Sequence, residues 1–518
     1  MGSTKTELVL LGALAVLVLY SMVRAISSPL RHIPGPFVAR FTKLWYLYAI
    51  WRGDAEKRII NLHRMHARPG EFYAPVIRLG PNLYSLSKPD KSVYGIKSKM
   101  PKSSWYEGWK HPHPERWTLF TDRDNKRHGQ TRRLVANMYA MSALVSYEKY
   151  VDECTGIFQA RLDEIASLGQ YVDMAHWFQC YAFDMIGNVT YGKRYGFLDV
   201  GNDIGNTMRA LDRAMYYGTL VGVYAWAHPF LYNILEYFPS SGAAGRSYLM
   251  RFANNIIADR KIQRREASYN GHTLEEKGQD ATEDFLDKIL HMRDDEKKGV
   301  TDYHVLSMSL SNIFAGSDTT AVTLSGILYH LIRTPHAMQT LRDEIEAFSP
   351  RNADLTDSVS FKVSQDMKYL QACIKEGLRM HSATGLPMWR VVDGEGAEAC
   401  GQFFPPGTEV GTCAWTAHFD EHAYGNDVAS FRPERWLDVQ SDETRMKLMD
   451  ANYMPFGLGS RTCIGRHISH LEISKLLPSI VRNYDFELEQ LDKAWTTHNS
   501  WFVRPMDFYV LVKKRLVF

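Results

Sequence analysis

One short stretch near the C-terminus constrains this chain more than any other, MPFGLGSRTCIG at residues 454–465. Cys463 has an arginine two residues before it and a glycine two residues after it. Gly457, Gly459 and Gly465 allow a close backbone approach that a side chain would block, so amide N–H groups can point at a thiolate and tune it. Phe456 can cover the sulfur. The pattern favours a thiolate that ligates haem iron; the alternative is a buried structural cysteine in a glycine-rich turn.

Composition places the rest of the chain in one large globular unit. The chain has 518 residues, 45% of them hydrophobic and 12% aromatic, which is enough for a sizeable core. No Gly/Ser-rich or Pro-rich linker divides its interior. A formal net charge of +3 is too balanced for a nucleic-acid-binding protein, so no nucleic acid is expected as a partner. The six cysteines are scattered, without a CxxC pair, which fits a reducing compartment.

The N-terminus carries an apolar run. Residues 8–23 hold no charge and lie between Glu7 and Arg24, slightly short of the ~20 residues that span a bilayer. We predict an uncleaved transmembrane anchor at residues 1–28, with a cleaved signal peptide as the alternative. More basic residues follow the apolar run than precede it, so by the positive-inside rule the main domain should lie in the cytosol. A proline-rich hinge is expected at residues 29–40, followed by the main domain at residues 41–518.

A second motif lies inside a long predicted helix. Apolar periodicity predicts a helix over residues 301–333, which Pro335 stops. Within it, AGSDTT at residues 315–320 contains Gly316, a poor helix former, and two threonines that can bond back to carbonyls and loosen a turn. A functional site explains such a flaw; small residues for tight helix packing are the alternative.

Three charged elements complete the pattern. His128 and Arg132 lie at i and i+4 on one face of a predicted helix, where they could bind a carboxylate. Glu376 and Arg379 share another helical face at i and i+3, and FRPERW at residues 431–436 supplies Arg435 as a third member. In isolation such groups are more often a solvated basic face or a surface salt bridge.

Together these motifs resemble the cytochrome P-450 family, whose haem-binding signature Phe-x-x-Gly-x-Arg-x-Cys-x-Gly is filled at every defining position by residues 456–465. The resemblance implies a mainly α fold with small β-sheets, the cytochrome P-450 fold, preceded by one N-terminal transmembrane helix. It also implies haem b (iron protoporphyrin IX) as cofactor and Cys463 as its metal ligand. Phe456, Gly457, Arg461 and Gly465 would surround the cofactor.

The resemblance assigns further roles residue by residue. Thr319 would hydrogen-bond the oxygen bound in the pocket, and Asp318 would relay protons. His128 and Arg132 would bind one haem propionate, and Arg390 the second. Glu376, Arg379 and Arg435 would form a buried structural network that holds the cysteine loop.

The implied reaction is a monooxygenation in which one atom of O2 enters an unactivated C–H bond of a small molecule and the other leaves as water. Electrons would come from NADPH through NADPH-cytochrome P-450 reductase, with cytochrome b5 as a second candidate donor. The reductase would dock on a basic surface formed by Lys126, Arg127, Arg132, Arg133, Arg461 and Arg466. The enzyme would sit in the endoplasmic reticulum membrane, single-pass, with its catalytic domain in the cytosol.

The likeness is to fungal enzymes of secondary-metabolite biosynthesis. A haem-thiolate isomerase or dehydratase that needs no external electrons, and a non-catalytic haem sensor, are the alternative functions. The sequence does not specify the substrate. Nine candidate pocket residues indicate a bulky, largely apolar molecule: Trp105, Trp109, Ser311, Phe314, Ala315, Thr384, Leu386, Asn499 and Trp501.

Overall fold

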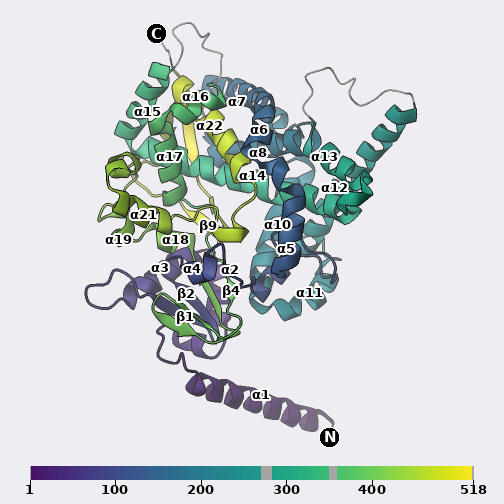
Figure 1. Ribbon diagram of the computed structural model, residues 1–518, viewed down its shortest axis with the longest axis vertical. Helices are drawn as coiled ribbons and strands as arrows, with labels where there is room; N and C mark the ends of the chain where they lie inside the picture. Colours follow the sequence, from purple (N-terminus) through teal and green to yellow (C-terminus); the bar gives the residue numbers. More distant parts are fainter. Residues whose placement is uncertain (1, 270–282, 349–358, 516–518) are drawn as a thin grey trace.

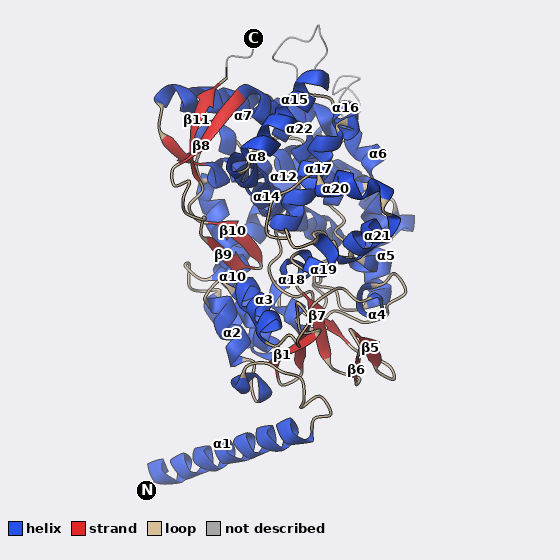
Figure 2. Ribbon diagram, turned by 90° about the vertical axis from the view of Figure 1, so that its left-hand side faces the viewer, coloured by secondary structure: helices blue, strands red, loops and turns tan. Residues whose placement is uncertain are grey.

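A computed structural model describes residues 2–269, 283–348 and 359–515. The chain is mainly helical, with four small sheets, which confirms the predicted fold class in its coarse form. Figure 1 shows the helices gathered into one body, and Figure 2 shows the strands near its periphery at opposite ends.

The helices of eight or more residues are α1 (Gly2–Ser27), α2 (Leu44–Trp51), α3 (Ala55–Met65), α5 (Asn125–Val135), α7 (Glu148–Leu168), α8 (Met174–Tyr191), α10 (Thr207–Val221), α11 (His228–Leu235), α12 (Gly242–Tyr269), α13 (Phe285–Asp294), α14 (Asp302–Arg333), α15 (Pro335–Phe348), α17 (Lys368–Met380), α21 (Glu443–Asn452) and α22 (Arg466–Asn483). The shorter α-helices are α4 (Lys91–Tyr94), α6 (Met141–Leu144), α9 (Phe197–Val200), α16 (Phe361–Asp366), α18 (Ala414–His418), α19 (Glu421–Tyr424) and α20 (Arg435–Asp438).

The strands form one larger sheet and three smaller ones. The four-stranded sheet has the order β1 (Val76–Gly80), β2 (Leu83–Leu86), β7 (Glu409–Thr412) and β4 (Arg390–Val391). The three-stranded sheet has the order β3 (Tyr171–Asp173), β11 (Tyr509–Lys514) and β8 (Tyr484–Leu488). Two hairpins pair β5 (Ala397–Ala399) with β6 (Gln402–Phe404) and β9 (Thr497–Ser500) with β10 (Phe502–Pro505). Arg390 is thereby fixed on a strand whose partner, β7, pairs with a strand from the N-terminal part of the chain.

Helix α14 runs through the middle of the body (Figure 1). The Thr301 side chain caps its first turn in a capping box with His304, and the helix ends just before Pro335, as predicted. Its 32 residues continue without interruption through the AGSDTT motif, so no loosened turn is seen there. Gly316 instead lies against α8, where an added Cβ would come 2.7 Å from a side-chain carbon of Ile186. The glycine therefore permits tight helix packing, the alternative explanation for this motif.

Helix α1 covers the apolar run at the N-terminus and lies at the edge of the body in Figures 1 and 2. Over residues 2–269, 283–348 and 359–515, no helix combines the length and the apolar character needed to cross a bilayer. The transmembrane helix predicted at residues 1–28 is thus not confirmed.

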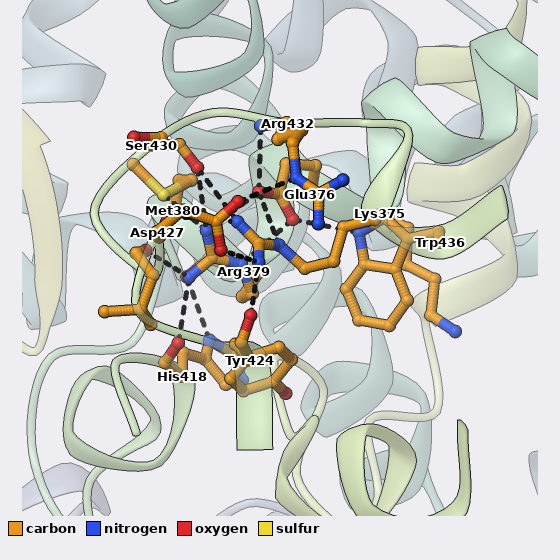
Figure 3. A network of polar contacts seen from close by, with 12 residues as sticks. Lys375, Glu376, Arg379, Met380, His418, Tyr424, Asp427, Ser430, Arg432 and Trp436 are labelled. Carbon is orange, nitrogen blue, oxygen red and sulfur yellow. Dashed lines mark hydrogen bonds and ion pairs between the residues drawn. The ribbon is translucent and has the colours of Figure 1, made fainter. Parts of the chain in front are cut away.

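A buried ion-pair network surrounds the end of α17 (Figure 3). The side chains of Glu376 and Arg379 are fully buried and joined by two hydrogen bonds of 2.8 and 2.9 Å. Glu376 also accepts from the Arg435 Nε at 3.4 Å and from the Trp436 indole at 2.9 Å. The arginines outweigh the burial that would raise the pKa of Glu376, so its pKa lies below the usual range. The carboxylate therefore stays charged and holds two chain segments together.

The same network reaches the cysteine loop through His418. One ring nitrogen of His418 contacts the carbonyl oxygen of Arg379 at 3.1 Å, and the other accepts the backbone N–H of Met454 at 2.9 Å. Burial lowers the pKa of His418 to about 3, so the ring is neutral, with Nδ1–H donating and Nε2 accepting. Met454 begins the loop that carries Cys463, so the position of that loop depends on α17.

We expect Glu376→Gln to destabilise the protein severely, by roughly 3–5 kcal/mol, because it removes one partner of a buried pair and leaves Arg379 uncompensated. The measurement is thermal or urea unfolding. Asp438→Asn is the matched control, because it breaks the Arg432–Asp438 pair nearby, whose side chains are 41% and 57% exposed. That control should change stability by less than about 1 kcal/mol. Equal effects of the two substitutions would contradict the prediction.

A second buried acid should make the free energy of unfolding depend on pH. Glu472 on α22 is 1% exposed, and burial raises its pKa from 4.5 to about 8. The folded state therefore binds a proton that the unfolded chain loses above about pH 4.5. Its contribution to stability is fully present below about pH 4.5 and is lost as the pH rises through 8. Glu472→Gln should remove this decline, making the variant more stable than wild type at pH 8.5 by an amount on the order of a few kcal/mol. The exposed Glu489→Gln serves as control; unchanged pH slopes in both variants would refute the assignment.

Candidate functional site

The loop before α22 presents Cys463 on a tightly constrained backbone. The Cys463 amide donates to the Phe456 carbonyl at 2.8 Å, which closes the loop. Gly457 has φ of +67°, a conformation that favours glycine. Gly459 has φ of +65°, and a Cβ there would come 2.1 Å from the Tyr94 carbonyl oxygen. The glycine spacing seen in the sequence is thus required by the loop.

The Cys463 thiol is surrounded by protein but exposed to an internal cavity. Burial raises its pKa, whereas the backbone N–H groups of Gly465 and Arg466 and the charge of Arg132 lower it. Both amides belong to the start of α22, where the helix dipole also favours negative charge. The sulfur therefore sits where a thiolate would be stabilised once a metal ion displaced its proton.

Cys463 and Thr319 line the same cavity, which has a volume of about 340 Å³. Thr319 comes from α14, and Cys463 from the loop before α22. The cavity wall is mostly apolar, with Ile186, Phe314, Ala315, Phe456 and Ile468 among its members. Two elements far apart in the sequence thus line one cavity.

Five cationic or titratable side chains gather near the cysteine end of this cavity: Lys102, His128, Arg132, Arg390 and Arg461. They are close enough to affect one another, because Arg461, Lys102, Arg132 and Arg390 all add to the burial that lowers the pKa of His128 to about 3. Burial, then Arg390 and Arg461, also hold the pKa of Lys102 well below its usual range. The sequence patterns predicted four of these residues and missed Lys102.

The cationic side chains of this cluster differ in how many hydrogen bonds they make to the protein. Arg461 donates to the Asp122 carbonyl at 2.9 Å and to Asn125 Oδ1 at 2.6 Å, and Arg390 donates to the Trp389 carbonyl at 3.0 Å. Within the described part of the chain, the Arg132 guanidinium has no hydrogen-bond or ion-pair partner. No Asp or Glu is among the described residues that line the cavity. Asp122, a buried acid that pairs with Arg127 and does not line the cavity, acts electrostatically on Lys102 and Arg461, so the cations have no counter-charge within the described cavity lining.

This donor set fits a haem. A haem needs a thiolate at the iron, apolar surface around the macrocycle and cations for its two carboxylates. The cavity supplies Cys463, an apolar wall and a cluster of cationic side chains. Cations in a buried site without acids carry a desolvation cost that two incoming carboxylates would offset.

Thr319 and Asp318 occupy different environments although they are neighbours. The Thr319 hydroxyl faces the cavity and donates to the Ala315 carbonyl at 2.7 Å, so it can accept a further hydrogen bond. Asp318 is 1% exposed and is not among the lining residues. It pairs with Arg504 of β10, accepts from the Gln179 amide at 2.6 Å, and through Arg504 joins a cluster with Asp212.

Six of the nine pocket residues expected from the sequence line the cavity: Trp109, Ser311, Phe314, Ala315, Thr384 and Trp501. The expectation was wrong for three. Trp105 packs behind Trp501 and donates its indole N–H to the Thr219 carbonyl. Asn499 donates to the buried Glu56 carboxylate, and Leu386 lies in the core.

Comparisons with known proteins agree with this geometry. The family model "Cytochrome P-450" matches residues 43–512. A pisatin demethylase of Fusarium vanettenii is 35% identical over 501 residues, which cover 96% of this chain and 91% of that protein. The cytochrome P-450 monooxygenases cicH of Emericella nidulans and gsfF of Penicillium aethiopicum are 32% and 31% identical, each alignment covering 94% of both chains. The chain therefore belongs to the cytochrome P-450 family: it is a monooxygenase, an oxidoreductase whose cofactor is protoporphyrin IX haem.

Proposed function

We propose that this enzyme oxidises a bulky, largely apolar small molecule with O2 and NADPH-derived electrons, in fungal secondary-metabolite biosynthesis, and that Cys463 is its axial thiolate. One observation carries the proposal: Cys463 and Thr319 line the same mostly apolar cavity. The similarity to a pisatin demethylase and to fungal monooxygenases supports the substrate class.

Haem, when bound, supplies the activation of O2 and the insertion of one oxygen atom into a C–H bond. The chain's own residues hold and orient that group. Cys463 provides the sulfur, and the amides of Gly465 and Arg466 stabilise its negative charge. Arg132, Arg390 and Arg461, together with Lys102 and the neutral ring of His128, would bind the two carboxylates. Phe456 and Gly457 cover the sulfur side.

Thr319, on the cavity wall formed by α14, would position the bound O2 and control the delivery of protons to it. Its Oγ1 faces the cavity and can accept a hydrogen bond there, and rotation of χ1 would free its proton from the Ala315 carbonyl. Asp318 can act as a proton relay only after its ion pair with Arg504 loosens, because that pair and Gln179 engage both carboxylate oxygens. Burial raises the pKa of Asp318 and Arg504 opposes this rise, so a loosened pair favours proton uptake.

Electrons enter from NADPH-cytochrome P-450 reductase, or from cytochrome b5, at the face near the cysteine loop. Of the six basic residues expected to form a docking surface, Lys126, Arg133 and Arg466 are exposed. Arg132 and Arg461 line the cavity, and Arg127 pairs with Asp122 at 2.6 Å. The proposed docking surface for an acidic redox partner therefore consists of these three exposed cations.

Membrane attachment is part of the proposal. Residues 1–28 would anchor the protein in the endoplasmic reticulum membrane as a single pass, residues 29–40 would orient it, and residues 41–518 would form the cytosolic haem domain. The uncharged run at residues 8–23 supports the anchor. A second exposed apolar surface would touch the bilayer: it is formed by Trp226 just before α11, Phe230 within α11, and Tyr237 and Phe238 just after it.

The alternative functions lack comparable support. A haem-thiolate isomerase or dehydratase would need no external electrons, and a sensor would need no hydroxyl facing the sulfur across the cavity. Thr319 occupies that place here, and the similar proteins named above are monooxygenases or a demethylase. We therefore favour an NADPH-dependent oxidation.

The first test of the proposal is the carbon monoxide difference spectrum of the reduced, haem-loaded protein, because it reports the axial ligand directly. We expect a red-shifted, thiolate-type Soret band that Cys463→Ser abolishes. Cys400→Ser is the matched control, because Cys400 is a free cysteine outside the cavity. A thiolate band that survives Cys463→Ser would eliminate Cys463 as the ligand.

A second test asks whether Thr319 controls the use of O2 or only lines the cavity. Thr319→Ala should uncouple NADPH consumption from product formation and lower the product formed per NADPH by at least about tenfold, because a positioned proton-transfer group typically contributes a factor on the order of 10²–10⁴. Thr323→Ala is the control, because it removes a hydroxyl from the same wall one turn further along α14. Coupling in Thr319→Ala that equals the Thr323→Ala value would remove the proposed role.

A further inference from the structure

The cavity holds a sixth cation, Arg246, far from the cysteine end. Arg246 lies on α12, is 8% exposed and lines the cavity. Its Nε is sealed from solvent without an acceptor. Across the described residues, no hydrogen bond or ion pair reaches any nitrogen of this guanidinium. Its Cζ lies 5.5 Å from the centre of the Phe314 ring, the one favourable contact that orients it.

Arg246 does not belong to the cation cluster near Cys463. The groups whose charges act on it are Tyr232, Tyr303 and Tyr217, none of them an acid, and burial lowers its pKa. Phe314, beneath it, precedes Thr319 by five residues on α14, which is about 7.5 Å along the helix axis. The guanidinium therefore sits toward the opposite end of the substrate space.

The surroundings of Arg246 favour an anion. Arg116 is near enough to act on the same tyrosines, Tyr232 and Tyr303. Glu236, an acid whose charge acts on Tyr232 beside Arg246, is exposed and accepts instead from Ser247 at 2.7 Å. A buried guanidinium without a partner is strongly unfavourable unless a ligand supplies the acceptor.

We propose that Arg246 binds a carboxylate of the substrate, so that the substrate is a bulky, mostly apolar molecule with one carboxylate on the order of 10 Å from the carbon that is oxidised. This inference rests on the proposed function, because it places the substrate in the same cavity. It adds a charged group to the bulky, largely apolar molecule that the sequence indicated. A planar guanidinium would bind both carboxylate oxygens and so fix the orientation of the substrate.

The test compares acids with their neutral amides. Phenylbutanoic, phenylhexanoic and phenyloctanoic acids, and the corresponding primary amides, are titrated into the haem-loaded protein, with binding measured by calorimetry and by the shift of the Soret band. We expect at least one acid to bind about tenfold or more tightly than its amide in wild type, as a charge-assisted pair predicts. Arg246→Gln should abolish this preference, and Arg246→Lys should restore part of it.

Arg251→Gln is the matched control, because it removes the same charge from an exposed position on the same helix. It should leave the preference for the acid unchanged. Arg246→Gln should fold with an unchanged or higher melting temperature, since it removes an unpaired buried charge. A melting temperature that falls sharply would indicate that Arg246 serves packing instead.

Two results would overturn the inference: no acid binds better than its amide in wild type, or the preference persists in Arg246→Gln. The carbon monoxide band is recorded for every variant. A thiolate band with no preference for the acid refutes the role of Arg246 alone. A missing thiolate band in wild type refutes the proposed function, while calorimetry still reports whether Arg246 selects an acid.

Discussion

The buried carboxylate of Glu376 is the interaction on which the site depends. It joins α17 to Arg435 and Trp436, segments about 60 residues further along the chain. From Arg379 the connection continues through the neutral ring of His418 to the first residue of the cysteine loop. A loop whose glycines allow left-handed backbone conformations has little rigidity of its own. Its geometry must therefore come from outside, and the network supplies it at a point nine residues before Cys463.

The parts of this arrangement that could be predicted are those encoded over short distances in the sequence. The glycine spacing around Cys463 predicted a loop in contact with a cofactor, and Thr301 and Pro335 marked both ends of α14 to within one or two residues. The i, i+3 spacing of Glu376 and Arg379 predicted their pair. In each case the information lies within one helical turn or one turn of chain, where periodicity and capping rules apply.

What could not be predicted depends on contacts between distant segments. Lys102 reaches the cavity from a loop and Arg246 from α12, and neither residue stands in a recognisable pattern. The pairing of Asp318 with Arg504 joins residues 186 positions apart. Helix α14 continues unbroken through Gly316, and the close approach of Ile186 gives this glycine a packing role instead of the loosened turn expected there. Sequence spacing identifies a small residue but does not reveal which neighbour requires it.

The charges of the cavity suggest how one enclosed space can hold two different anions. Cations collect at the cysteine end and, separately, at Arg246, and no acid is among the described lining residues. At an effective dielectric constant of about 20, two unit charges at 4 Å interact by about 4 kcal/mol. Such a pair in a mostly apolar cavity favours a carboxylate over a neutral isostere. The same burial makes each unpaired cation costly in the empty protein. The chain therefore gives up stability at both ends of the cavity, and on our proposal haem would offset that cost at one end and an acidic substrate at the other.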